Sequence, residues 1–362
     1  MATELPNRWE GQLPFGPDRT GLRVLLVRLS AIGDVIHGLP VLNALREAMP
    51  DAFLAWVVER RAAALLEGHP ALDALVVAER GWLWHPRQVW QLRRTLRQLR
   101  PEVAIDLQGL ARSAIAAWLS GARRRIGFGC EKGRELSPWL NNELVRSTRQ
   151  HIIDCNLELL RPLGIENPPV RFNLPEKEQD RAWADRWLAE QALSAGGFAL
   201  INPGAGWPSK RWPPERYAAV AAAVGRKWQL PSVVLWAGQE ERQWAEQVVA
   251  GSQSQARLAP PTSLLQLAAL CRRARMFIGS DTGPLHLAAA VGTPCVGLYG
   301  PMPAERNGPY GPQHIAIQKA RFTGSSRQRR TAPPDLMLAI QVEDVLAACA
   351  EILRRPGPAV GH

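Results

Sequence analysis

Short apolar runs with the composition of strands alternate with helical stretches along most of this chain, in two separate series. The first series has apolar runs at 23–27, 54–58, 74–77, 103–106 and 125–128, with helical stretches at 41–48, 60–67 and 87–100. The second has apolar runs at 198–202, 232–236, 257–258, 276–278 and 294–298, with helical stretches at 214–226, 240–250, 263–271 and 284–291. This alternation predicts parallel sheets covered by helices on both faces. We therefore expect an α/β protein with two doubly wound sheets.

Length and composition agree with two domains. A chain of 362 residues exceeds what one hydrophobic core commonly serves. Its 46% apolar and 21% charged residues are typical of a globular protein. The Pro-Pro pair at 168–169 and the charged stretch 176–181 suit a linker, and a hinge is expected near 168–180. The expected parts are a flexible extension at 1–21, a Rossmann-like domain at 22–178, a second at 179–341, and a C-terminal helix and tail at 342–362.

A strand-turn-helix signal in the second series predicts a phosphate site. An apolar run is followed at 279–290 by Gly-Ser-Asp-Thr-Gly-Pro-Leu-His-Leu-Ala-Ala-Ala. Pro284 suits the start of a helix, and Gly283 permits close approach of the backbone to a ligand. The N–H groups of the next two residues would then point out of the helix end, where phosphate binds. The alternative is an ordinary helix start capped by Asp281 or Thr282.

A second loop adds positive charge. The run at 198–200 leads into Ile-Asn-Pro-Gly-Ala-Gly-Trp-Pro-Ser-Lys-Arg-Trp-Pro at 201–213. Small residues permit close backbone approach, and Lys210 is the candidate for a point-charge contact with a diphosphate. The two prolines at 213–214 suit the entry of the next helix. Taken alone, this segment is equally typical of an exposed basic loop.

A third loop follows the first predicted strand. It reads Ser-Ala-Ile-Gly-Asp-Val-Ile-His at 30–37, and Asp34 opens the next helical segment. Ligands of open α/β sheets bind beyond the carboxyl ends of the strands, where this loop would lie. The alternative for Asp34 is a plain helix N-cap.

Composition limits the partners. The five cysteines are scattered without a CxxC pair, so neither a disulfide framework nor a metal site is expected. The first twenty residues lack the apolar core of a signal peptide, and no apolar run reaches membrane-spanning length. A net charge of +11 predicts an anionic partner. The basic runs lack the interleaved aromatic residues of RNA-binding sheets, so nucleic acid is not expected. Trp82, Trp84 and Trp90 lie among basic residues and are candidates for a membrane interface.

In their order along the chain, these segments resemble glycosyltransferase family 9, the bacterial ADP-heptose:lipopolysaccharide heptosyltransferases, and are most similar to the heptosyltransferase I type. The resemblance covers about 22–350. The matching segments are Gly-Asp-Val-Ile-His at 33–37, Trp-Val-Val-Glu at 56–59, Asp-Leu-Gln-Gly-Leu at 106–110, Lys-Arg-Trp-Pro at 210–213 and Asp-Thr-Gly-Pro-Leu-His-Leu-Ala-Ala at 281–289.

The resemblance implies a GT-B fold, with two facing Rossmann-like domains and a cleft between them, and a reaction. The implied donor is ADP-L-glycero-D-manno-heptose, the acceptor is a Kdo-bearing lipid A or inner core, and the anomeric carbon is inverted. No Asp-x-Asp segment occurs to hold a metal with the diphosphate, so a metal-independent reaction without cofactor is expected. The implied location is the cytoplasm, peripheral on the anionic cytoplasmic face of the inner membrane.

The resemblance also assigns roles to residues. Asp34 would be the general base, with His37 as its rival, and Lys210 would contact the diphosphate. The expected donor-binding residues are Ser209, Lys210, Glu240, Glu241, Asp281, Thr282, Gly283, Pro284, Leu285 and His286. Either Glu240 or Glu241 would hold a ribose hydroxyl, and an acidic helix start is the equal alternative. The expected acceptor-side residues are Arg28, Ser30, Gly33, His37, Arg112 and Arg125.

Two departures from the family pattern concern the acceptor more than the fold. They are the long N-terminal extension and the basic, turn-rich segment 321–334. Two alternatives therefore stay open. One is an inverting GT-B transferase that uses another nucleotide sugar or a later core acceptor, and the other is a non-catalytic protein that binds anionic glycolipid or nucleic acid.

Overall fold

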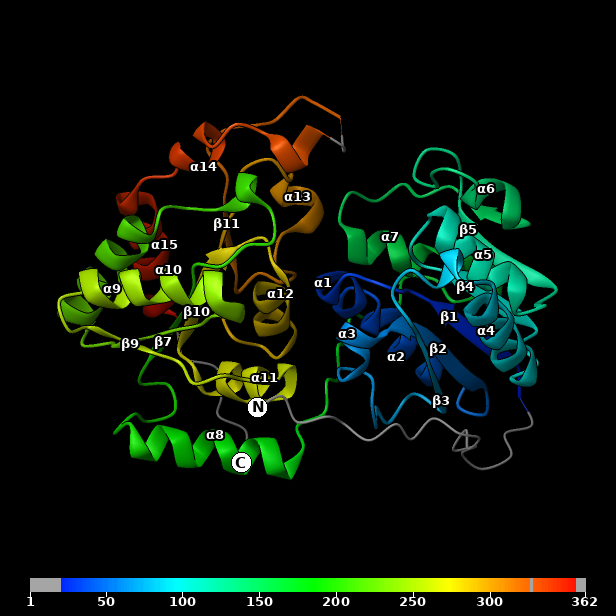
Figure 1. Ribbon diagram of the computed structural model, residues 1–362, viewed down its shortest axis with the longest axis horizontal. Coiled ribbons are helices and arrows are strands. Elements are labelled where there is room, and N and C mark those ends of the chain that lie inside the picture. Colours follow the sequence, from blue (N-terminus) through cyan, green and yellow to red (C-terminus); the bar gives the residue numbers. More distant parts are fainter. Residues whose placement is uncertain (1–20, 326–327, 356–362) are drawn as a thin grey trace. The chain divides into compact units, whose positions relative to one another are not determined.

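A computed structural model of the chain describes residues 21–325 and 328–355 (Figure 1). These residues form two compact units. The first contains 21–29, 42–147 and 159–166, and the second contains 30–41, 148–158 and the described residues from 167 onward. The domain boundaries expected from the sequence stay a prediction. Most of the expected extension at 1–21 and the end of the expected tail lie outside the described residues.

The first unit contains a six-stranded, all-parallel sheet with the order β3-β2-β1-β4-β5-β6. Its strands are β1 (Arg23–Val27), β2 (Phe53–Glu59), β3 (Ala74–Ala78), β4 (Val103–Asp106), β5 (Arg124–Phe128) and β6 (Glu143–Val145). The five strands predicted from the apolar runs are confirmed. The sixth was not predicted, because β6 is only three residues long and only one of them is buried.

Helices cover this sheet. The chain from β3 to β6 forms η1 (Trp82–Trp84), α4 (Pro86–Gln98), α5 (Ala111–Leu119) and α6 (Ser137–Leu140), and α4, α5 and α6 lie side by side in Figure 1. The remaining helices are α2 (Leu39–Ala48), α3 (Arg60–Ala63) and η2 (Arg161–Leu163). Leu92 and Leu96 of α4 join Ala116 and Ala117 of α5 in one core against the strands. The helix predicted at 60–67 is shorter than expected, because it ends at Ala63 and gives way to turns.

The second unit repeats the same topology, with the order β12-β11-β10-β7-β8-β9. Its strands are β7 (Ala199–Asn202), β8 (Ser232–Val234), β9 (Ala256–Leu258), β10 (Met276–Ser280), β11 (Cys295–Leu298) and β12 (Ile315–Ile317). Numbered from its own first strand, each sheet has the Rossmann order 3-2-1-4-5-6. The predicted strands are confirmed, and β12 is an additional three-residue strand beside β11.

The helices of the second unit include two that contradict or refine the expectations. The charged stretch 176–181, expected in a linker, leads directly into α8. Arg273 of α11 pairs with Glu176 just before this helix and with Asp185 within it. The last helix, α15, packs into the core of this unit through Val345 and Ile352. The helices are α1 (Ile32–Ile36), α7 (Ile152–Glu158), α8 (Glu178–Glu190), η3 (Pro208–Lys210), α9 (Pro214–Trp228), α10 (Gly238–Gly251), α11 (Leu264–Arg273), α12 (Gly283–Ala290), α13 (Ala304–Asn307), η4 (Gln328–Thr331), α14 (Asp335–Leu338) and α15 (Val342–Arg354).

Within the described residues, none of the helices is both long and apolar enough to cross a bilayer.

Candidate active site

The chain reverses its direction of winding between β7 and β10, and the site is built there. In an open parallel sheet of this order, ligands bind outside the carboxyl ends of the two strands at that point. Asn202 ends β7 beside Gly279 of β10. Its side-chain amide donates to the carbonyl oxygen of Gly204 at 3.1 Å and to the hydroxyl of Thr282 at 3.4 Å. The two motif loops predicted from the sequence are therefore joined at one sheet edge.

Lys210, Asp281 and His286 form a buried polar cluster at this edge. The Lys210 Nζ lies 2.6 Å from Asp281 Oδ2, and His286 Nε2 lies 3.0 Å from Asp281 Oδ1. The Asp281 side chain is only 4% exposed and that of Lys210 is 16% exposed. Burial would raise the pKa of Asp281, but the hydrogen bond from His286 and the charge of Lys210 outweigh it and hold that pKa at about 2. The carboxylate therefore stays ionised and fixes both neighbours.

The start of α12 differs in two details from the prediction. Thr282 occupies the N-cap position without a side-chain cap, since its hydroxyl donates to the Ser280 carbonyl oxygen. Pro284 is the second helical residue. The backbone N–H of His286 already donates to the Thr282 carbonyl oxygen at 3.3 Å, so it does not point out of the helix end as expected. The N–H groups of the first turn that remain for an anion are those of Gly283 and Leu285, because proline has none.

Helix α1 packs directly against α12. A Cβ atom on Gly33 would lie 2.7 Å from the Cδ2 atom of His286, and one on Gly283 would lie 3.0 Å from Ile32. The space beside Gly283 is occupied by Ile32, and the expected contact of this glycine with a ligand stays a prediction. Both glycines are therefore needed for the close contact between these helices.

Asp34 is the third residue of α1 and follows Gly33 directly. Its Oδ2 accepts the backbone N–H of Ala31 at 3.2 Å, so the carboxylate reaches back to the helix start and is not the N-cap itself. The side chain is half-buried. The structure thus brings Asp34 to the same region of the second unit as the cluster of Lys210, Asp281 and His286.

His37, the rival candidate for the base, is enclosed. It is 3% exposed, and its ring lies edge-on to that of His286 with 4.3 Å between centroids. The His151 ring is 6.3 Å away on another side and contacts Tyr310. Burial lowers the pKa of His151, whose Nε2 is bonded to the Gly308 carbonyl oxygen at 2.9 Å. This packing favours the half-exposed Asp34 over His37 as a group that can meet a substrate.

The sequence reasoning missed His151 and Tyr310. Tyr310 donates its hydroxyl hydrogen to Asp154 at 2.8 Å, which ties α7 to the segment before β12. Neither residue belongs to a motif, and they are about 160 positions apart, so no local pattern indicated their contact.

The two acidic candidates for the ribose differ sharply. Glu240 points to solvent and pairs with Arg211 at 3.2 Å. Glu241 is turned inward: its Oε2 accepts the N–H of Ala237 at 2.9 Å, and a Cβ on Gly204 would lie 2.4 Å from its carboxyl carbon. Burial raises the pKa of Glu241, although the Ala237 N–H opposes this. Of the two, Glu241 borders the loop that leads to Lys210.

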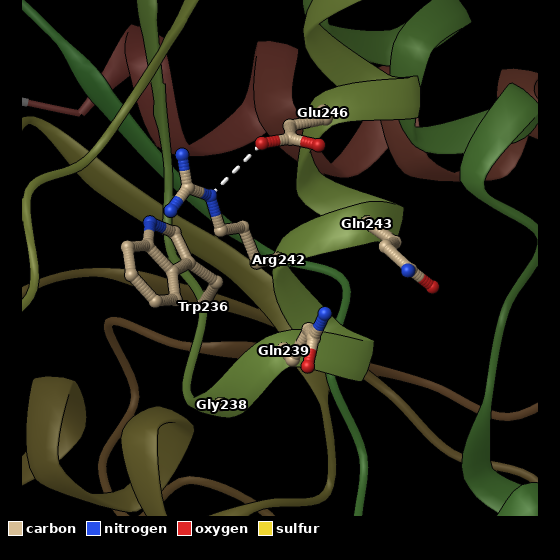
Figure 2. A pocket seen from close by; sticks show the side chains of 6 residues that line it. All are labelled: Trp236, Gly238, Gln239, Arg242, Gln243 and Glu246. Carbon is tan, nitrogen blue, oxygen red and sulfur yellow. Dashed lines mark hydrogen bonds and ion pairs between the residues drawn. The ribbon is translucent and has the colours of Figure 1, made fainter.

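A cavity of about 450 Å³ lies beyond the carboxyl end of β8, along the face of α10 that carries Gln239, Arg242, Gln243 and Glu246; Glu241 lies on the opposite face of this helix. Figure 2 shows its lining, which consists of Trp236, Gly238, Gln239, Arg242, Gln243 and Glu246. The Trp236 indole N–H donates to the Ala259 carbonyl oxygen at 2.8 Å, and the Arg242 guanidinium lies 5.2 Å from the ring centroid. Arg242 is in turn held by Glu246 at 2.9 Å. The cavity therefore offers a fixed aromatic wall beside polar groups, which suits a planar polar ring. Neither Trp236 nor Arg242 was singled out from the sequence.

Other predicted donor and acceptor residues have structural partners. Ser209 is buried and donates to the Arg329 carbonyl oxygen at 2.8 Å. Arg28 is buried and bonded to the Leu107 carbonyl oxygen. Arg112 pairs with Glu59 at 2.8 Å, at the carboxyl edge of the first sheet.

Arg125 lies in the wrong place for a ligand of that edge. It is the second residue of β5 and donates to the carbonyl oxygens of Leu140 and Ala122, at the amino edge of the sheet. Ser30, by contrast, follows Leu29 at the carboxyl edge and belongs to the α1 segment.

No group of three or more His, Cys, Asp or Glu side chains with metal-binding geometry occurs among residues 21–325 and 328–355.

Comparisons with known proteins show the family of the chain. The model of the family described as glycosyltransferase family 9 (heptosyltransferase) matches residues 89–335. Lipopolysaccharide heptosyltransferase 1 of Pseudomonas aeruginosa is 31% identical over 82% of this chain and 83% of its own length. The Escherichia coli K12 protein of the same name is 28% identical over 83% of this chain and 94% of its own.

Solved structures show the same fold. A glycosyltransferase family 9 protein from Veillonella parvula has a TM-score of 0.79 and 25% identity, over 92% of this chain and 97% of that one. The E. coli heptosyltransferase WaaC, solved with ADP, has a TM-score of 0.72 and 23% identity, over 91% of this chain and all of that one.

Proposed function

Because this chain belongs to glycosyltransferase family 9 and is a glycosyltransferase with the two Rossmann-like domains of a GT-B fold, we propose that it transfers L-glycero-D-manno-heptose from ADP-heptose to a Kdo-bearing lipid A or inner core. Its similarity to lipopolysaccharide heptosyltransferase 1 proteins supports a heptosyltransferase of lipopolysaccharide-core biosynthesis. The observation that carries the proposal is the ion-paired cluster of Lys210, Asp281 and His286 at the winding reversal of the second sheet, with the Asp34 helix packed against it.

The donor lies along the carboxyl edge of the second sheet. The ribose lies beside Glu241, whose carboxylate faces the loop after β7. The diphosphate lies at the start of α12, where the N–H groups of Gly283 and Leu285 and the ammonium of Lys210 meet it. Asp281, which is held in turn by His286, orients Lys210, and Thr282 helps to fix the loop.

The reaction inverts the anomeric carbon. The acceptor oxygen forms a bond to that carbon, the bond to the diphosphate oxygen breaks, and ADP leaves with the electron pair. Asp34 takes the proton of the acceptor hydroxyl as the new bond forms. Lys210 and the helix end stabilise the charge that gathers on the diphosphate, which is where fixed cations and dipoles lower the barrier most. These groups supply the charge without a metal ion.

Within the second unit, the acceptor side is carried by the α1 segment. Ser30, Gly33 and Asp34 lie on the α1 segment, and Arg28 and Arg112 are near the ends of β1 and β2. A lipid-anchored acceptor places the enzyme on the cytoplasmic face of the inner membrane, where the net charge of +11 favours anionic lipid.

The test is acceptor-dependent release of ADP from ADP-heptose, with Kdo2-lipid A as acceptor. We expect Asp34→Asn and Lys210→Gln to lower kcat by about a hundredfold or more. Asp51→Asn, at an exposed turn, is the matched control and should retain the wild-type rate.

Release of UDP from a UDP-sugar, without release of ADP from ADP-heptose, would assign a different donor and leave the proposed mechanism unchanged. Full activity of Asp34→Asn would remove Asp34 as the base. The absence of turnover with every nucleotide sugar would leave a protein that only binds glycolipid.

A further inference from the structure

The exposed tryptophans of the described chain all lie on one side of the first unit. They are Trp84 at 85%, Trp90 at 58%, Trp118 at 55% and Trp139 at 86% exposure. They come from η1, α4, α5 and α6, the consecutive helices between β3 and β6 (Figure 1). In contrast, Trp82, a membrane candidate from the sequence, is buried in the core at 2% exposure.

Helix α4 places arginines among these rings. Its sequence contains four arginines and no acidic residue. Arg87, Trp90, Arg94 and Arg97 follow one another at spacings of three and four, so they share one face of the helix. The opposite face carries Leu92 and Leu96, which are buried against the sheet. The outward face is therefore cationic and aromatic along its whole length.

The arginines of this face lack acidic partners among residues 21–325 and 328–355. No ion pair to Arg87, Arg93, Arg94 or Arg97 occurs in the part of the chain that the structure describes. By comparison, Arg112 and Arg124 of the same unit each pair with a glutamate. Arg94 instead lies 5.6 Å from the centre of the Trp90 ring.

The neighbouring helices continue the surface. Arg97 reaches the turn after α5, where a Cβ on Gly121 would lie 3.6 Å from its Nε atom. This turn is three residues beyond Trp118. Arg125 bonds the carbonyl oxygens of both Ala122 and Leu140, so the end of α6, which carries Trp139, is tied to the end of α5. We call this surface the Trp-Arg face; it consists of Trp84, Arg87, Trp90, Arg93, Arg94, Arg97, Trp118 and Trp139.

We propose that the Trp-Arg face docks on the surface of an anionic phospholipid bilayer. Indole rings prefer the boundary between headgroups and hydrocarbon, and guanidinium groups bind lipid phosphates, so one bilayer surface satisfies both. Single-stranded nucleic acid fits less well, because its stacking sites are grooves and sheet surfaces, whereas this surface is the outside of a helical layer. The proposal rests on the proposed function in one respect: a lipid-anchored acceptor requires the enzyme at a bilayer.

The experiment is co-sedimentation of the full chain with vesicles of phosphatidylethanolamine and about 30% phosphatidylglycerol, and with vesicles of phosphatidylcholine alone. We expect binding to the anionic vesicles that weakens as salt is raised, and little binding to the neutral ones. Arg87→Gln with Arg94→Gln should weaken binding about 25-fold, at about fivefold for each arginine. Trp84→Ala with Trp139→Ala should weaken it while leaving the salt dependence unchanged.

The matched control is Arg226→Gln with Lys227→Gln, which removes the same net charge from an exposed part of α9 in the second unit. It should bind anionic vesicles within about twofold of the wild type. Equal loss in this control would overturn the proposal, because net charge alone would then explain binding. Equal binding to neutral vesicles, or binding to RNA without binding to vesicles, would overturn it as well.

Turnover separates this proposal from the proposed function. With ADP-heptose and a deacylated, water-soluble acceptor, the arginine and tryptophan variants of the face should turn over at the wild-type rate. Vesicle binding that depends on the face, in a protein without heptosyl transfer, would support the docking surface and refute the proposed reaction.

Discussion

The ion pair between Lys210 and Asp281 should be worth far more than a surface pair of the same length. Lys210 Nζ and Asp281 Oδ2 are 2.6 Å apart, with side chains 16% and 4% exposed. Lys319 and Asp344 are also 2.6 Å apart, but their side chains are 47% and 24% exposed. The two pairs have the same residue types and the same distance, so burial is the main difference between them.

The pKa of Asp281 supplies the magnitude. Its fall from 3.8 to about 2 corresponds to about 2 kcal/mol in favour of the ionised carboxylate. This is the net result after the opposing cost of burial, so the favourable interactions of Lys210 and His286 together exceed it. We therefore expect a coupling free energy of about 1–2 kcal/mol between Lys210 and Asp281, and about 0.5 kcal/mol or less for the exposed pair. Because the folded pKa is lower than the unfolded one, the contribution is complete above about pH 4 and is lost as the pH falls toward 2.

The assay is a double-mutant cycle in urea at pH 7. Lys210→Gln, Asp281→Asn and the double variant give the buried coupling, and Lys319→Gln, Asp344→Asn and their combination give the exposed one. Lys210→Gln should also lower kcat by about 10²–10³, whereas Lys319→Gln should not change it. Equal coupling in the two cycles would refute the reasoning, since burial would then contribute nothing.

Three further outcomes are expected. Gly33→Ala places a methyl group 2.7 Å from the His286 ring and should destabilise the protein by about 1–3 kcal/mol in calorimetry; an unchanged Tm would mean that α1 is not held there. Burial lowers the pKa of His314 to about 4, so the unfolded chain takes up the proton first and stability should fall by up to about 3 kcal/mol between pH 6.5 and 4. In urea titrations, His314→Gln should reduce this dependence of the unfolding free energy on pH. An unchanged pH dependence would mean that other groups cause it. Glu241→Gln should raise KM for ADP-heptose about tenfold in initial-rate assays, while Glu240→Gln stays within twofold; the reverse order would assign the ribose to Glu240.

The place of the donor loops could be predicted from the sequence, because two local signals determine it. An apolar run fixes each strand, and a glycine- and proline-containing turn follows β7 and β10. Strand order then brings the two turns together; the ion pair between Lys210 and Asp281, which the motifs did not indicate, follows from this placement. Periodicity and turn chemistry are sufficient for this much.

What could not be predicted depends on contacts between distant segments. The neighbour of Gly283 is Ile32, and nothing local to either residue indicates the other. The choice between Glu240 and Glu241 depends on helix rotation by one residue, which places one carboxylate in solvent and the other against Gly204. The short strands β6 and β12 are stabilised by pairing with a longer neighbour and not by their own composition.

The split of the chain between the two units has a consequence for the order of folding during synthesis. Residues 30–41 leave the ribosome early, yet they belong to the second unit and pack on α12, about 250 residues later in the chain. The first sheet can form once β6 has been made, while the segment that carries Asp34 gains its contacts within the second unit only later, first from Asn156 of α7 and then from α12. The α1 segment is therefore among the last parts of the second unit to be fully packed, and a nascent chain stopped before α12 would have a folded first sheet without the complete candidate site.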